Sequence, residues 1–188
     1  MSEQLTPACQ AVQSWVAEVV VGLNFCPFAH REVEKQSIRY VDSRAQSIEQ
    51  ALTDLVQAMQ ELLQDDATET SLVVLSEGFT EFVDYLDLLD YVALTLREFQ
   101  LEGTLQIASF HPHYQFADTA EDDVSNYTNR APYPVLHVLR EASLAKALAR
   151  YPYPEQIPER NIKMAEQQGK AYFDTLLARL RAASSVAR

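Results

Sequence analysis

Apolar residues recur at steps of three and four along several stretches of this chain, and this spacing predicts amphipathic helices. Other apolar runs are short and bounded by polar residues, which indicates strands. The predicted helices span residues 7–21, 44–63, 81–100, 144–150 and 159–181, the last with a bend at Gly169. The predicted strands are residues 37–41, 71–76 and 104–110. Strands alternate with helices from residue 37 to residue 110, and helical crossovers of that length favour parallel neighbours.

This order of elements predicts an α/β fold, or an α+β fold, with a mostly parallel sheet of three or four strands packed against helices. The chain has 188 residues, of which 47% are hydrophobic. A chain of this length can bury a core of ordinary size as one unit. We therefore expect a single domain that spans residues 1–188.

The stretch that follows Phe110 has no long periodic element before residue 143. It holds three of the eight prolines and three of the four histidines. A loop of this length is usually functional or disordered, and its many aromatic and aliphatic side chains argue against disorder. We expect residues 111–161 to form an ordered segment over the strand ends, with a short helix at 135–140.

Charge is unevenly distributed along the chain, whose net charge is −12. Residues 1–123 hold five Lys and Arg against 22 Asp and Glu, whereas residues 124–188 hold ten against five. An acidic chain has no general affinity for the phosphates of nucleic acid, so we expect no nucleic-acid partner. The basic C-terminal part either aids solubility by forming a dipolar surface or lines a pocket for an anion.

The hydrophobic runs are too short for a membrane span, since the run at 19–29 is broken by Asn24 and Pro27. The first residues lack a basic region followed by an apolar stretch, so we expect no secretory signal. Two cysteines, with no CxxC spacing, suggest neither a disulfide framework nor a zinc site. A cytoplasmic protein without a membrane partner is the expectation.

The stretch "FHPHYQFAD" (110–118) places two histidines at the end of a predicted strand. His111 and His113 are two residues apart, so in an extended chain both side chains point the same way. Two such imidazoles could exchange protons with a substrate, hydrogen-bond an anion or bind a metal. Further metal ligands would be Asp118, Cys26 or His137, although no known zinc spacing is present. Both histidines could equally be neutral hydrogen-bonding residues at a strand end.

The stretch "NYTNRAPYPVLHVLRE" (126–141) concentrates amide, hydroxyl, imidazole and guanidinium groups. Such groups suit a planar anion, which an arginine can hold with two parallel hydrogen bonds. The other reading is a loop whose polar side chains bond its own backbone. The candidate substrate-binding residues here are Asn126, Thr128, Asn129, Arg130, His137 and Arg140.

Two further stretches carry candidate residues. Cys26 in "LNFCPFA" is either a small buried apolar residue or a nucleophile, and the second role needs a nearby base or cation. In "IPERN" (157–161), helix capping explains Pro158 and Glu159 but not Arg160 and Asn161, which we add to the substrate-binding candidates.

Together, "LNFCPFA", "HPHYQFAD", "NYTNRAPYPVLHVLRE" and "IPERN" resemble a bacterial family known only as a domain of unknown function, number 1415. The resemblance covers nearly the whole chain. It implies a single-domain cytoplasmic protein with no established activity, substrate or cofactor, so the cofactor stays unknown.

Two functions are compatible with these residues. The first is a small enzyme, of hydrolase or transferase type, that acts on a small anionic substrate. In this reading His111 and His113 exchange protons, Cys26 is an optional nucleophile, and Arg130, Arg140 and Arg160 bind the anion. The second is a domain that binds a metabolite or a partner protein without catalysis.

Overall fold

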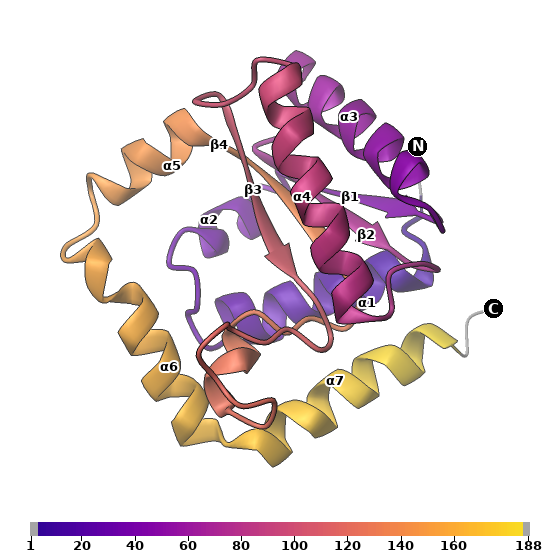
Figure 1. Cartoon of the computed structure of the whole chain (residues 1–188). Coiled ribbons are helices and arrows are strands. Elements are labelled where there is room, and N and C mark those ends of the chain that lie inside the picture. The colour runs from indigo at the N-terminus through magenta and orange to yellow at the C-terminus, as the bar shows by residue number, and fades with distance from the viewer. Residues whose placement is uncertain (1–3, 186–188) are drawn as a thin grey trace.

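The computed structural model describes residues 4–185, which form four strands surrounded by helices (Figure 1). The strands are β1 (Ile38–Ser43), β2 (Thr70–Leu75), β3 (Leu105–Phe110) and β4 (Val135–Arg140). The α-helices are α1 (Pro7–Trp15), α2 (Ala29–Glu34), α3 (Ile48–Gln64), α4 (Phe82–Glu98), α5 (Glu141–Leu148), α6 (Ile157–Gln168) and α7 (Lys170–Ser185). A π-helix, Val16–Val21, continues α1, and two 3-10 helices span Val124–Thr128 and Pro154–Gln156.

The four strands form one mixed sheet in the order β1-β2-β4-β3. Strands β1 and β2 are parallel neighbours, whereas β4 runs antiparallel to both β2 and β3. The α/β class was therefore predicted correctly, but the expectation of a mostly parallel sheet is wrong. The strands β1, β2 and β3 do share one direction, and the sheet is mixed because β4 inserts between β2 and β3.

Strand β4 occupies the segment for which a short helix was predicted, and that prediction is wrong. Three of its residues, Val135, Leu136 and Val138, are fully buried. A central strand buries both faces, so its apolar residues need not alternate, and the pattern can be mistaken for a short helix. Val135 and Val138 are also β-branched, which favours a strand.

The segment 111–161 lies over the strand ends only in its first half. Residues 111–134 follow the end of β3 and lead into β4, which carries the chain back across the sheet. Helix α5 then starts at the opposite end, since Arg140 pairs with Leu105 at the beginning of β3. In Figure 1, α5, α6 and α7 follow one another around the outside of the molecule as an orange-to-yellow arc.

Most predicted helices are confirmed to within a few residues. The first helix begins at Pro7 with Thr6 as its N-cap, whose side chain accepts a hydrogen bond from the Cys9 amide. The predicted bend at Gly169 is a break between α6 and α7, where the backbone φ is +77°, an angle that glycine tolerates best. Helix α2 was missed because none of its six residues is fully buried, so it shows no apolar period.

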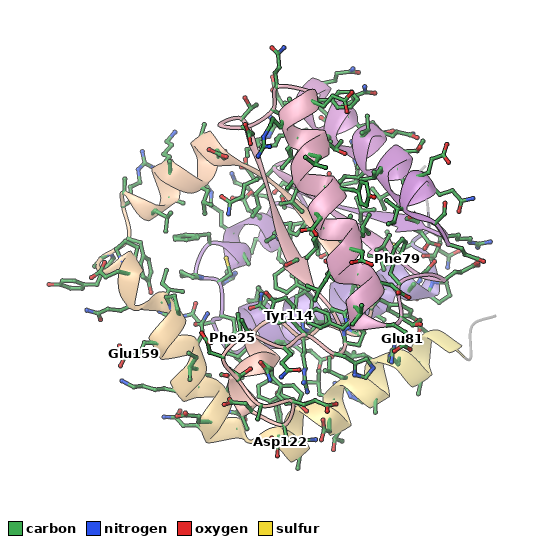
Figure 2. The ribbon with its side chains drawn as sticks, in the orientation of Figure 1. Phe25, Phe79, Glu81, Tyr114, Asp122 and Glu159 are labelled. Atoms are coloured by element: carbon green, nitrogen blue, oxygen red, sulfur yellow. The ribbon has the colours of Figure 1, made fainter. Side chains whose placement is uncertain are left out.

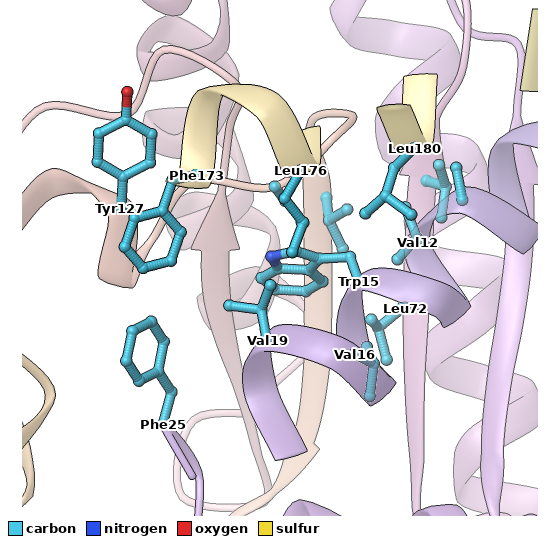
Figure 3. Packing of buried hydrophobic residues seen from close by; sticks show 14 of the residues in the cluster. Val12, Trp15, Val16, Val19, Phe25, Leu72, Tyr127, Phe173, Leu176 and Leu180 are labelled. Carbon is cyan, nitrogen blue, oxygen red and sulfur yellow. The ribbon is translucent and has the colours of Figure 1, made fainter. Parts of the chain in front are cut away.

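The helices cover the two faces of the sheet with separate apolar clusters. Helices α3 and α4 pack on the face that presents Val73, Leu136 and Val138. The π-helix, α1 and α7 form the second cluster with side chains such as Leu72 from the other face. Figure 3 shows Trp15 at the centre of this second cluster. No helix within residues 4–185 combines the length and apolar character that a bilayer crossing requires.

Candidate ligand-binding site

A cavity of about 670 Å³ lies against the sheet face on which α1 packs. Its floor is made by side chains from all four strands, and its walls come from the π-helix, α2 and α5. The wall helices α2 and α5 lie in the left half of Figure 1. We call it the sheet cavity. Its floor includes Ile38, Thr70, Leu72, Ala108, His137 and Leu139.

The floor is apolar apart from a hydrogen-bonded pair. Thr70 Oγ1 donates to the Val138 carbonyl at 2.5 Å, so the hydroxyl accepts from His137 Nε2–H at 2.7 Å. Burial holds the pKa of His137 at about 4, below its usual value of 6.5, so the imidazole is neutral at pH 7. His137 therefore offers Nδ1, an acceptor nitrogen, rather than a positive charge.

Two walls of the sheet cavity are the short helices α2 and α5, and Val33 of α2 is their one side chain that packs against a core cluster. Neither α2 nor α5 has a fully buried residue. Ala147 shares a face of α5 with Ser143 and Leu144, because it follows them by four and three residues, and all three line the cavity. Across the opening, Phe28 meets Tyr151 edge to face, with ring centroids 5.7 Å apart.

The loop that carries Cys26 is held by the start of α6. Arg160 donates to the Asn24 carbonyl at 2.9 Å and to the Tyr151 hydroxyl at 2.5 Å. Asn161 donates to the Phe25 carbonyl at 2.7 Å. Figure 2 shows Phe25 on the side of the molecule where α6 passes. Arg160 and Asn161 thus join two of the sequence stretches that were singled out, and they hold the loop from which Cys26 and Phe28 line the sheet cavity.

Cys26 lines the sheet cavity together with His137. Burial raises the pKa of the Cys26 thiol above its usual value, and backbone hydrogen bonds from Phe28 and Ala29 only partly offset this effect. The group is therefore a neutral thiol at pH 7 rather than a thiolate nucleophile. Cys9 is also a free thiol, and it is buried in the core.

Charged residues at the sheet cavity are mostly cationic. Arg31, Lys35, Arg140, Lys146 and Arg150 line it, against the two carboxylates Glu32 and Glu69. The Arg140 guanidinium is already bonded to the carbonyls of residues 62, 65 and 68. The remaining cations belong to α2 and α5 or to the residues that follow these helices.

His111 lies away from the sheet cavity and is fully buried. Its Nδ1 accepts from the His113 amide at 3.0 Å, so its Nε2–H donates to the Phe79 carbonyl at 2.9 Å. Burial lowers its pKa to about 4, which keeps the ring neutral. Both nitrogens are used by the backbone, which leaves none for a metal or a substrate in this conformation.

His113 and Arg130 line a second hollow, of about 630 Å³, near the start of α7. The Arg130 guanidinium donates to the carbonyls of Tyr114 and Glu121 and stacks on the Tyr127 ring at 4.6 Å. Cationic residues here are balanced by carboxylates, and Asp174 accepts hydrogen bonds from both Tyr127 and Lys170. In Figure 2, Asp122 lies at this corner of the molecule.

The amides and hydroxyl of the 126–129 stretch mainly bond the backbone around them. Asn126 accepts from the Phe116 amide and donates to the Ala120 carbonyl. Thr128 donates to the Ser125 carbonyl, and Asn129 to the Ser109 carbonyl. These bonds fix the loop that follows β3. They agree with the second interpretation of this stretch, in which polar side chains bond the backbone of their own loop.

The structure therefore divides the predicted site residues among several places. Cys26, His137 and Arg140 line the sheet cavity, His113 and Arg130 line the second hollow, and the others hold loops. Their catalytic and substrate-binding roles stay predictions. Among the polar residues at the sheet cavity, sequence reasoning missed Lys35, Thr70 and Lys146, because an isolated Lys or Thr carries no local signal.

Metal-binding side chains do not cluster in the part of the chain that the structure describes. No group of three His, Cys, Asp or Glu residues gathers there with a geometry that could hold an ion.

The fold and the site define a class of protein, namely a single α/β domain with a ligand-sized cavity over one face of its sheet. The chain belongs to the family described as a protein of unknown function, DUF1415, whose sequence profile matches residues 7–175. The matched range includes every wall and floor element of the sheet cavity, and the resemblance noted in the sequence is confirmed. Comparisons with curated proteins and with solved structures gave no match.

Proposed function

We propose that this chain binds a small metabolite in the sheet cavity. The observation that carries the proposal is a hollow of about 670 Å³ with a mainly apolar lining and a few polar groups, His137 and Thr70 among them. Sites for small molecules have this size and composition, because apolar walls supply affinity and a few polar groups fix orientation.

The sheet cavity suits the expected anionic ligand better than the second hollow does. Around the second hollow, Arg130 is bonded to carbonyls and the carboxylates of Glu121, Asp122 and Asp174 offset the cations. Around the sheet cavity, cations outnumber carboxylates. Neither hollow suggests a nucleic-acid or membrane partner. The cytoplasm remains the proposed location, and the two free cysteines support it.

A hydrolase or transferase reaction is the second candidate, because Cys26 and His137 line the same cavity. The raised pKa of the Cys26 thiol weighs against it, since a nucleophile needs a lowered one. Non-catalytic binding is therefore the function we favour.

Blocking the cavity tests the proposal. In Ala147→Trp the new indole fills space that the ligand needs, whereas Ala145→Trp places the same side chain on the exposed side of α5 and is the matched control. The probe is the fluorescent amphipathic anion anilinonaphthalene sulfonate, and its binding is followed by fluorescence titration. We expect the wild type and Ala145→Trp to bind it alike, and Ala147→Trp to lose about tenfold or more in affinity, that is at least ~1.4 kcal/mol.

Equal binding by both tryptophan variants would exclude the sheet cavity as the binding site. Incubation with decanoyl esters, followed by mass spectrometry of the compounds recovered, separates the two candidate functions. A binding protein returns decanoyl esters unchanged, whereas a hydrolase or transferase returns products that depend on Cys26.

A further inference from the structure

Within residues 4–185, the unpaired cations gather at one place. Most described Lys and Arg side chains have a carboxylate or carbonyl partner, as Arg39 does with Glu61 and Asp65. Three side chains within residues 4–185 make neither an ion pair nor a side-chain hydrogen bond: Lys35, Lys146 and Arg150. All three line the sheet cavity.

This arrangement is unexpected for a chain with 27 carboxylates and 15 Lys and Arg residues. Acidic side chains are plentiful enough to pair every cation, and pairs form elsewhere, such as Lys163 with Glu159. Exposed cations left without partners around one opening create a positive local potential, which attracts an anion.

The positions of these cations indicate how a ligand lies in the sheet cavity. Lys35 follows the last turn of α2, and Lys146 and Arg150 come from α5 and the turn after it, so the cations lie on the walls that α2 and α5 form. All three residues are exposed, whereas the floor around Leu72 is buried and apolar. A ligand can therefore place a charged head at the opening while its apolar body covers the floor.

The volume sets the size of that body. One water-sized group takes about 30 Å³ of liquid volume, so a cavity of about 670 Å³ has room for roughly 20 such groups. This is the size of a fatty or aromatic acid. A nucleotide fits less well, because its sugar and base need several hydrogen-bonding partners that the apolar floor does not supply.

We infer that the sheet cavity takes an amphipathic anion, with an alkyl or aromatic body over the sheet and a carboxylate or phosphate head held by Lys35, Lys146 and Arg150. This inference rests on the proposed function, because it names the ligand class of the same site. Arginine and lysine both hold carboxylate and phosphate groups, so the chemistry of the head is shared by the two classes.

Calorimetric titration of three ligands with one alkyl chain tests the inference. The ligands are decanoate, decyl phosphate and the neutral decanol, each below the concentration at which it aggregates. The variant Lys35→Gln/Lys146→Gln/Arg150→Gln removes the three cations, and all three positions are exposed, so folding is unaffected. The matched control Arg44→Gln/Arg97→Gln/Lys163→Gln removes the same charge from residues that do not line the cavity.

We expect the wild type and the control to bind the anions more tightly than decanol. We call the triple variant of Lys35, Lys146 and Arg150 the cavity variant. Its affinity for the anions should fall by about tenfold or more, while its affinity for decanol stays the same. The relative affinity of decanoate and decyl phosphate then tells which head the site prefers. Added salt should weaken binding of the anions but not of decanol.

Two results would overturn the inference: wild type that binds decanol as tightly as the anions, or a cavity variant that binds the anions as wild type does. Both leave the proposed function intact, because a ligand still binds. Failure of all three ligands to bind the wild type, together with dye binding that Ala147→Trp does not weaken, contradicts the proposed function itself.

Discussion

At the scale of single residues, the structure separates two kinds of histidine that the sequence does not distinguish. His111 bonds two backbone groups and is fully buried, so it supports the loop after β3. His137 bonds Thr70 and lines the sheet cavity. Both are neutral because burial penalises the charged imidazole. The difference between them lies in what the second nitrogen faces, which depends on distant segments of the chain.

The buried neutral His111 predicts a pH dependence of stability. Its pKa is about 4 in the folded protein against a usual 6.5, so the unfolded chain takes up the proton first as the pH falls. Its contribution is present above pH 6.5 and is lost between 6.5 and 4, an effect of about 3 kcal/mol. Urea unfolding measures the free energy of unfolding across this pH range. As the pH falls, this free energy should decrease less steeply in His111→Leu than in the wild type.

His30→Leu is the control for that measurement, because the His30 side chain is 66% exposed. It should keep the slope of the wild type. An unchanged slope in His111→Leu would mean that His111 is not held neutral by burial.

At the scale of elements, the helices differ in how firmly they join the core. Helices α3 and α4 each bury several side chains against the sheet, including Leu55 and Leu88. Helices α2 and α5 bury none completely, and α5 packs mainly on β4. These two weakly anchored helices form two of the walls of the sheet cavity, which leaves them free to adjust to a ligand.

Hydrogen exchange should reveal this difference. We expect amides of α2 and α5 to exchange faster than those of α3 and α4, because segments with few buried contacts open at lower free energy. Bound decanoate should slow exchange in α2 and α5 specifically, as followed by mass spectrometry of peptic fragments. If the amides of α5 exchange as slowly as those of α4 in the absence of ligand, the weak anchoring of α5 is contradicted.

At the scale of the whole molecule, the C-terminal helix completes the core that the N-terminal helix begins. Phe173 stacks on both Tyr127 and Phe25, and Leu176 and Leu180 pack near Trp15 (Figure 3). The two ends of the chain thus depend on each other, although more than 150 residues separate them in the sequence. Helix α1 therefore packs against both the sheet and α7.

Truncation of Phe173 tests this dependence. Phe173→Ala should lower the free energy of unfolding by roughly 3 to 5 kcal/mol, because it removes a ring from a packed core. Tyr172→Ala, one residue earlier on α7 and 37% exposed, should cost less than about 1 kcal/mol. Chemical denaturation measures both, and similar losses would show that α7 is held by its surface rather than by Phe173.

The sequence by itself determined most helices, the first three strands and the break at Gly169, because these depend on local periodicity and local backbone preference. Only the tertiary structure decided that residues 135–140 form a central strand, because that assignment depends on hydrogen bonds with β2 and β3 from distant parts of the chain. The same holds for the sheet cavity. Its unpaired cations are recognisable only in the folded structure, because ion pairing is set by distance in the fold rather than along the chain.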